Sequence, residues 1–339
     1  MIYKLMENRV FRTYPGGSRI DRLLHGVPGA DGMFPEDWLA STVRAFNPGR
    51  EHIPEGLGKT EDGTPVSQLA PQGLPILVKL LDAAQRLVIQ VHPTRAFAME
   101  AWHSPVGKTE CWYVLEAETS ACVYIGFQET VTRERWIDAC NRQDIPAMLG
   151  MLHCFPVKSG DCVFVPGGVP HAIGGGCLLL ETQEPSDLMV VPERRTPAGL
   201  PLDERKLHGG LGFSRMYDCF QYKGLPREEA RKTFFQSPVP LEDGFLRYVD
   251  ARDNGIFSVL TCRTEKVVRR IFQESFAIAV VTEGCGSIEQ EDQIVPVRQG
   301  DRLLILNLAK TRLTIAAEAS RLAVAFALPS ETPTAARPD

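Results

Sequence analysis

Short apolar runs that end in glycine, proline or a charged turn recur along almost the whole chain, and they constrain the fold more than any other feature. In many of them apolar residues alternate with polar ones, which is the period of a strand with one buried face. Closely spaced short strands between turn residues are typical of sandwiches and barrels. The pattern predicts a mainly β fold with the architecture of a sandwich or barrel. The clearest runs are LPILVKLLDA (74–83), RLVIQVHP (86–93), CWYVLEAE (111–118), CLLLETQ (177–183), FAIAVVTEG (276–284) and LAVAFAL (322–328).

The length of 339 residues favours two domains, at roughly 150 residues per domain. An internal echo supports this division, because SGDCVFVPGGVPHAI (159–173) and QGDRLLILNLAKTRL (299–313) both place Gly-Asp before a strand. The second copy has Thr311 where the first has His171. We therefore expect the C-terminal unit to be a structural partner.

The predicted N-terminal catalytic barrel covers residues 1–222 and the predicted degenerate barrel covers residues 223–330. Within the first, helical rather than alternating spacing predicts a small helical insertion over residues 130–153. The tail, residues 331–339, is rich in proline, threonine and alanine, and we expect it to be disordered.

Charge and cysteine content exclude several classes of protein. Lys and Arg number 37 against 42 Asp and Glu, a net charge of -5, and no basic face for nucleic acid is evident. Nine cysteines without a C-x-x-C pair favour a reduced, cytoplasmic setting over a disulfide framework or a thiolate zinc site. No stretch resembles a secretory signal or a membrane span. We expect a cytoplasmic monomer or homodimer whose partner is a small molecule.

Four side chains at predicted strand ends and turns form a candidate metal site. Gln90 and His92 are two residues apart in one predicted strand, so they project to the same side. Glu110 and His171 follow in later turns. Each alone has an ordinary structural interpretation, but together they offer a nitrogen and oxygen donor set suited to Zn²⁺, with Fe²⁺, Mn²⁺ or Ni²⁺ as alternatives.

These residues lie in longer motifs that resemble a known family. LVIQVHP, GKTECWYVLEAE and PVKSGDCVFVPGGVPHAIGGGCLLLETQEPSD are similar to segments of the type I mannose-6-phosphate isomerases, short bacterial form, of the cupin superfamily. PGGSRI and EDWLAST resemble two earlier segments of that family. The resemblance implies two cupin-like jelly-roll barrels with a small helical insertion. It implies that Gln90, His92, Glu110 and His171 bind zinc. It also implies an aldose–ketose isomerase that interconverts mannose 6-phosphate and fructose 6-phosphate, or a related sugar or sugar phosphate, through a cis-enediol.

The resemblance also suggests catalytic residues. Lys108 corresponds to the lysine of the family's GKTE motif, and Glu181 to a glutamate that follows the ligand histidine. The alternative for Lys108 is an ordinary solvated charge. The alternative for Glu181 is a carboxylate at the end of a strand. For Asp187 we expect a turn-capping role.

Two departures from the family pattern affect residues that would contact the phosphate or stabilise charge in the active site. The family usually has a phosphate-contacting serine where this chain has Val88, and a tyrosine and an arginine where it has Val190 and Val191. Arg194 and Arg195 lie just downstream, and we consider them candidates for the missing guanidinium.

Other functions remain open at this point. The departures would also suit a carbohydrate-binding or sensing cupin that keeps its metal but not its catalysis. A further alternative is an iron-dependent cupin oxygenase, or an isomerase of non-phosphorylated sugars, that uses the same ligands.

Overall fold

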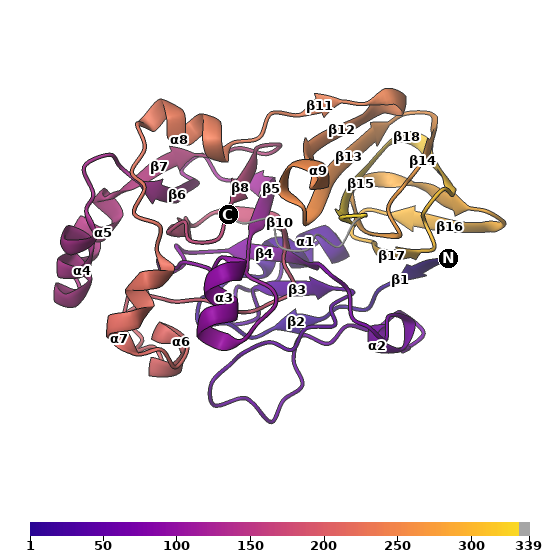
Figure 1. Ribbon diagram of the computed structural model, residues 1–339. Helices are drawn as coiled ribbons and strands as arrows, with labels where there is room; N and C mark the ends of the chain where they lie inside the picture. Colours follow the sequence, from indigo (N-terminus) through magenta and orange to yellow (C-terminus); the bar gives the residue numbers. More distant parts are fainter. Residues whose placement is uncertain (332–339) are drawn as a thin grey trace.

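The C-terminal part of the chain forms one large antiparallel sheet. The structure is a computed structural model that describes residues 1–331. The strand order is β1-β17-β15-β18-β13-β12-β11, with β14 paired to β18 and β16 paired to β15. Figure 1 shows these strands at one end of the molecule, in orange and yellow except for β1, which is indigo. They are β1 (Ile2–Lys4), β11 (Val239–Pro240), β12 (Phe245–Val249), β13 (Phe257–Thr264), β14 (Val267–Ile271), β15 (Phe276–Gln290), β16 (Gln293–Arg298), β17 (Arg302–Leu306) and β18 (Arg312–Pro329).

The N-terminal part contains two smaller antiparallel sheets, of orders β2-β3-β4-β10-β5-β8 and β7-β6-β9. Between them lies a buried cluster in which Trp112 packs with Ile125 and Phe155. The strands are β2 (Arg9–Val10), β3 (Glu36–Leu39), β4 (Leu77–Ala83), β5 (Glu110–Ala117), β6 (Cys122–Phe127), β7 (Leu152–Pro156), β8 (Cys162–Val165), β9 (His171–Ile173) and β10 (Cys177–Gln183).

The prediction of a mainly β fold is confirmed. Within residues 1–331, however, no ladder of hydrogen bonds closes a sheet into a barrel. The N-terminal unit has two separate sheets on either side of a core, because β6 pairs only with β7 and β9. The hydrogen bonding within the described part of the chain therefore does not show the barrels expected from the sequence.

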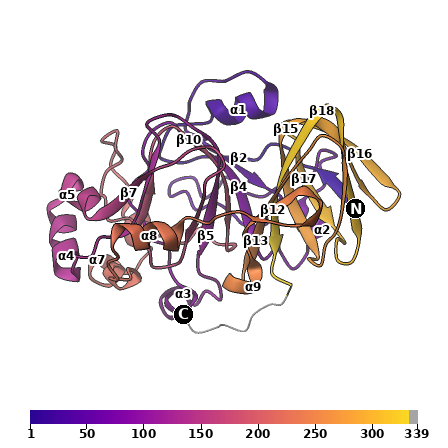
Figure 2. The ribbon, with the colours of Figure 1, turned by 90° about the horizontal axis from the view of Figure 1, so that it is seen from above.

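Short helices connect and cover the sheets (Figure 2). Within residues 1–331, none of them has the length and apolar character needed to cross a membrane. They are α1 (Ser18–His25), α2 (Val66–Leu69), α3 (Arg95–Trp102), α4 (Arg133–Arg142), α5 (Ile145–Gly150), α6 (Glu204–His208), α7 (Gly212–Arg215), η1 (Met216–Cys219), α8 (Arg227–Phe234), η2 (Glu242–Gly244) and α9 (Ala251–Asn254).

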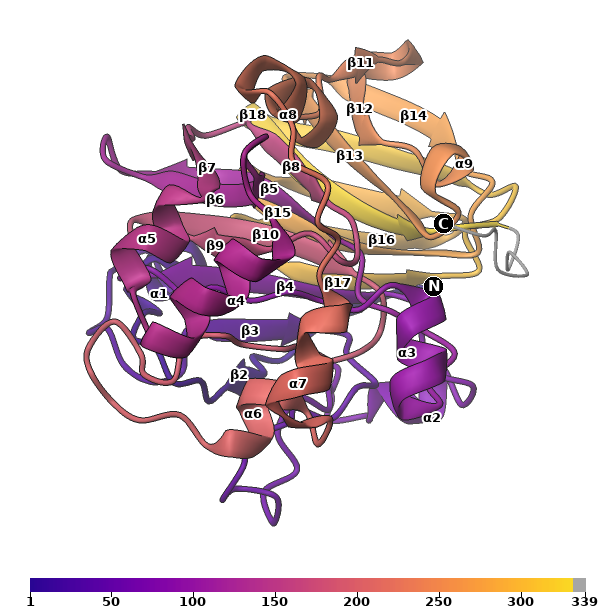
Figure 3. The ribbon, with the colours of Figure 1, turned by 60° about the vertical axis from the view of Figure 1, so that its left-hand side comes forward.

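Helices α4 and α5 lie where helical spacing predicts an insertion, between β6 and β7 (Figure 3). The side chain of Thr132 caps α4 and that of Asp144 caps α5, each by accepting a backbone N–H from the first turn. Trp136 and Met148 are fully buried in a cluster that also contains Met216. This packing anchors the insertion to the segment that leads out of the N-terminal unit.

The two units share more than a linker. Strand β1 pairs with β17 of the C-terminal sheet, and one buried cluster joins Leu180 of β10 to Ile278 and Ala325 of the large sheet. Helix α8, which follows residue 222, packs Phe234 into the core between the N-terminal sheets. The division at residue 222 stays a prediction. Of the tail expected to be disordered, residues 332–339 lie outside the described residues.

Candidate metal centre and active-site pocket

Three side chains from separate elements converge at one point of the N-terminal unit. The ligand atoms of His92, Glu110 and His171 all lie within 4.8 Å of one another. Nε2 of His92 is 3.1 Å from Oε2 of Glu110, and Nε2 of His171 is 3.4 Å from Oε1. All three side chains are buried. We call these three residues the metal-ligand triad.

Backbone pairing brings Gln90 to the same place. Gln90 and His171 each donate their N–H to the other's carbonyl oxygen, both at 2.9 Å. Side chains of directly opposed residues lie on the same side of a ladder, with Cβ atoms about 5 Å apart. The expected strand over residues 88–93 is present only as single bridges at Gln90 and Val91, because Pro93 ends the ladder and Thr94 caps helix α3.

The two histidines are held in the tautomer that a metal requires. Nδ1 of His92 is 3.1 Å from the carbonyl oxygen of Leu188, and Nδ1 of His171 is 2.9 Å from that of Val169. A carbonyl oxygen can only accept, so each Nδ1 carries the proton and each Nε2 presents a lone pair toward Glu110.

The protonation states also suit a cation. Burial lowers the pKa of His92 to about 3 and lowers that of His171, so both rings are neutral near pH 7. Burial alone would raise the pKa of Glu110, but Lys108 and His92 hold it well below its ordinary value. Trp112 donates its indole N–H to Oε1 of Glu110 at 3.0 Å and orients the carboxylate.

One buried nitrogen in the metal-ligand triad is left without a partner. Nε2 of His171 accepts no hydrogen bond, although such an atom normally has one when buried. Nε2 of His92 accepts instead from the ammonium of Lys108 at 2.6 Å, and Lys108 also donates to Glu110 at 2.7 Å. The triad therefore attracts a cation, and the donor set fits a divalent transition metal.

A pocket adjoins the metal-ligand triad. Gln90 and Lys108 line it, as do Glu181 and Asp187. Lys108 therefore belongs both to the wall of the pocket and to the surroundings of the triad. The three residues of the triad do not themselves line the pocket, so a ligand there would approach the triad past Gln90 and Lys108.

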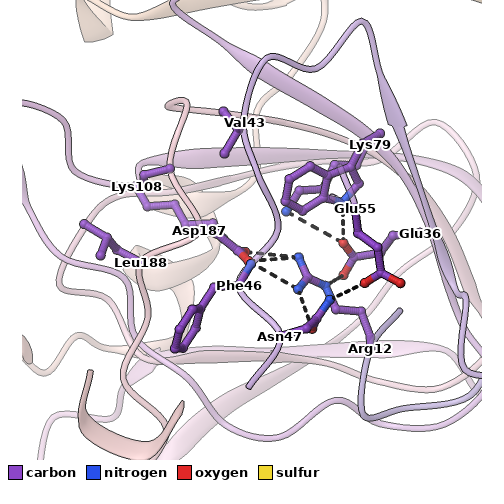
Figure 4. Close-up of polar contacts among 12 residues, drawn as sticks. Arg12, Glu36, Val43, Phe46, Asn47, Glu55, Lys79, Lys108, Asp187 and Leu188 are labelled. Atoms are coloured by element: carbon purple, nitrogen blue, oxygen red, sulfur yellow. Dashed lines mark hydrogen bonds and ion pairs between the residues drawn. The ribbon is translucent and has the colours of Figure 1, made fainter. Parts of the chain in front are cut away.

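A buried network of charges forms one wall of the pocket, and Figure 4 shows it around Arg12. Nε of Arg12 is 3.0 Å from Oε1 of Glu36, and its terminal nitrogens donate to both oxygens of Asp187 at 3.1 to 3.2 Å. Lys79 donates to Glu181 at 3.0 Å. Burial would raise the pKa of Glu36, but Arg12 and Lys79 lower it to about 2. Glu36 is therefore ionised at neutral pH and paired with Arg12.

Similar proteins share one activity in their names. No protein-family model matches the chain. A mannose-6-phosphate isomerase of Bacillus subtilis strain 168 is 30% identical over 238 residues, which cover 70% of this chain and 71% of the relative. The chain belongs to the mannose-6-phosphate isomerase family. A second relative in the family, from Streptococcus mutans, is 43% identical over 114 residues, 33% of this chain and 34% of its own.

Solved structures of the family share this fold. The crystal structure of mannose 6-phosphate isomerase from Bacillus subtilis has a TM-score of 0.74 at 23% identity and covers 96% of this chain and 99% of its own. A mannose 6-phosphate isomerase crystallised with zinc and yttrium has a TM-score of 0.69 at 16% identity, with the same coverage.

The structure brings together most of the site residues that the family resemblance implies. Lys108 lies at the metal-ligand triad, and Glu181 is buried in the wall of the pocket. Burial raises the pKa of Glu181 despite its pairing with Lys79. Asp187, which we expected to cap a turn, accepts hydrogen bonds from the Phe46 N–H and from Arg12.

The two downstream arginines lie elsewhere. Arg194 is exposed and stacks over Phe213, 5.3 Å from its ring centre. Arg195 is exposed and donates to the carbonyl of Gly199. Neither lines the pocket, whereas Val88 and Val191 both do.

Sequence reasoning missed four charged residues of the pocket: Arg12, Glu36, Lys79 and Lys206. Lys79 left one signal, because it is the one basic residue of β4, a strand in which every residue is buried. Such a lysine needs a buried partner. Arg12 and Lys206 lie outside the motifs that resemble the family, and neither left such a signal.

Proposed function

We propose that the chain is a metal-dependent aldose–ketose isomerase that interconverts mannose 6-phosphate and fructose 6-phosphate. The observation that carries this proposal is the buried metal-ligand triad with the unpartnered Nε2 of His171, beside a charged pocket, in a member of this family. The reaction moves a proton between C1 and C2 of the open-chain sugar through a cis-enediol.

Gln90, His92, Glu110 and His171 would hold the metal. Two neutral imidazoles, an amide oxygen and one carboxylate suit Zn²⁺, although Fe²⁺, Mn²⁺ or Ni²⁺ also accept such donors. A bound divalent ion supplies Lewis-acid polarisation of sugar oxygens. Gln90 lies where the pocket meets the triad, so the sugar oxygens would enter from that side.

Glu181 is our candidate for proton transfer. Its carboxyl lines the pocket, and burial raises its pKa toward the range in which a carboxyl both takes and releases a proton. Lys79, 3.0 Å away, orients it. Lys108 presents its ammonium between the pocket and the triad, where it would donate to a sugar oxygen that gains negative charge.

The test is an isomerase assay on zinc-loaded protein. Fructose 6-phosphate should form from mannose 6-phosphate in the wild type. Glu181→Gln should retain the metal and lose turnover, whereas Glu110→Gln should lose both. A fully metal-loaded wild type that forms no fructose 6-phosphate would contradict the proposed substrate.

A second candidate is a sugar-binding protein without catalysis. Val88 and Val191 favour it, because they line the pocket with apolar groups where the family pattern has a serine and an arginine. Calorimetry that detects sugar phosphate binding without turnover, unchanged in Glu181→Gln, would favour this candidate.

We also propose a domain organisation, an oligomeric state and a cellular setting for the chain. We infer two cupin-like units, catalytic over residues 1–222 and degenerate over residues 223–330, as either a monomer or a homodimer. A reduced cytosol suits the chain, because all nine cysteines are free, although Sγ of Cys111 and Sγ of Cys162 are only 3.2 Å apart.

A further inference from the structure

One basic residue in the wall of the active-site pocket takes no part in the ion pairs of the others. Four basic residues line it: Arg12, Lys79, Lys108 and Lys206. Three of these have carboxylate partners, in Glu36 and Asp187 for Arg12, Glu181 for Lys79, and Glu110 for Lys108. Within residues 1–331, Lys206 has no carboxylate at ion-pair distance. Its ammonium contacts only the amide oxygen of Asn47, at 3.4 Å.

The surroundings of Lys206 place it close to a second positive charge. The oxygen of Asn47 that accepts from Lys206 also accepts from Arg12, at 3.4 Å. Asn47 is itself held through its NH₂ group, which donates to Glu55 at 2.9 Å. Two cations thus meet at one neutral acceptor, an arrangement that favours binding of an anion.

The electrostatics agree with this geometry. Lys206 is half-buried, and burial, followed by the nearby charge of Arg12, lowers its pKa to about 8. An ammonium with this pKa is still mostly protonated at pH 7. An anion at the site would relieve both effects.

Backbone contacts place Lys206 beside Val191, one of the two valines that line the pocket. Val191 donates its N–H to the carbonyl of Leu207 at 2.8 Å, and the side chain of Leu207 is buried. Lys206 therefore stands next to the point where the pocket wall has Val191. The valine offers no side-chain donor there, whereas Lys206 offers three N–H groups.

We propose that Lys206, placed by Asn47 beside Arg12, binds the phosphate group of the sugar substrate. This assignment rests on the proposed function. The guanidinium of Arg12 is already paired with Glu36 and Asp187. Arg12 therefore attracts the phosphate by its positive charge and does not donate a bidentate hydrogen bond to it. Lys206 then determines specificity for phosphorylated over neutral sugars.

The experiment compares Lys206→Met with two matched variants. Lys206→Arg keeps the charge, and Lys223→Met removes an exposed lysine that does not line the pocket. A single charged hydrogen bond corresponds to about 10- to 100-fold in affinity. We expect Lys206→Met to raise the KM for mannose 6-phosphate by about this factor, with a much smaller change in kcat. Lys223→Met should behave as the wild type, and Lys206→Arg should retain most of the affinity.

A binding measurement separates this inference from the proposed reaction. Inorganic phosphate is titrated calorimetrically into the metal-loaded wild type and the variants, which requires no turnover. Phosphate binding that weakens by about 10-fold or more in Lys206→Met supports the assignment even if no isomerase activity is found. Equal phosphate affinity in the wild type and Lys206→Met, or no phosphate binding to the wild type, overturns it. Lys206→Gln, which can still bond Asn47, serves if the methionine variant does not fold.

Discussion

Gln90 and His171 are backbone partners, each donating its N–H to the other's carbonyl oxygen at 2.9 Å. This pairing places an amide and an imidazole side by side, although the two residues are far apart in the sequence. His92 follows Gln90 by two residues, so the same short segment carries two candidate ligands. The candidate metal site is thus positioned by main-chain hydrogen bonds rather than by flexible side chains.

Replacing Glu110 tests the anionic ligand. Glu110→Gln keeps the size of the side chain but removes the only carboxylate of the metal-ligand triad. We expect a loss of metal affinity greater than the roughly 10- to 100-fold that changes in outer-shell partners cause, with loss of turnover. Metal analysis after dialysis measures this. The exposed Glu129 provides the control, as Glu129→Gln, and equal metal content in both variants would refute the role of Glu110.

Replacing Glu181 tests proton transfer separately from metal binding. We expect Glu181→Gln to keep its metal and to lose about 10²- to 10⁴-fold in kcat, the usual contribution of a general acid or base. The KM should change little, because the glutamine has the same shape. Steady-state kinetics and metal analysis on one preparation check both. A kcat near that of the wild type would exclude Glu181 as the proton carrier.

The paired charges of the pocket wall make a prediction about stability. Arg12→Met would remove the ion-pair partner of the buried Asp187 and leave Glu36 with the more distant Lys79, at 4.0 Å. Breaking such a buried pair from one side costs about 3–5 kcal/mol, which denaturant unfolding can measure. The exposed ion pair of Arg142 with Asp138 is the comparison, and Arg142→Met should change the unfolding free energy far less. Similar values for the two variants would show that the Arg12 network is not stabilising.

Titration of Lys206 should make substrate binding depend on pH. The charged groups that face it are Arg12, Glu36, Asp187 and Asp203, and residues of these types do not titrate between pH 7 and 9. The pKa of Lys206 is lowered to about 8, so its ammonium is present below pH 8 and is lost above it.

The KM for mannose 6-phosphate should therefore rise as the pH passes about 8. Lys206→Arg should remove this rise, because a guanidinium stays charged, and Lys206→Met should show a high KM at every pH. KM profiles between pH 7 and 9 measure the effect. An unchanged profile in Lys206→Arg would assign the titration to another group.

Local patterns and family motifs pointed to the candidate metal ligands that the fold brings together, but not to the charged wall of the pocket. The two-residue spacing of Gln90 and His92 follows directly from strand geometry, and the family motifs pointed to Glu110 and His171. Arg12 and Asp187 are 175 residues apart in the chain, and only tertiary packing brings them together. The neighbours Arg194 and Arg195 drew attention by their sequence position, yet both side chains point to solvent.

Strand pairing in the sheets also could not be predicted from local patterns. Alternation correctly predicted that the chain is mainly β, because it reports which face of each strand is buried. It does not report which strands pair. The pairing of β1 with β17 and the separate sheet of β6, β7 and β9 depend on contacts between distant segments.

The most direct test of the account is metal content and isomerase turnover measured on the same protein before and after chelation. We predict one divalent ion per chain, loss of the ion and of fructose 6-phosphate formation together on chelation, and recovery of both when zinc is added. Undiminished turnover in protein with no detectable metal would contradict the central claim that Gln90, His92, Glu110 and His171 hold a catalytic cation.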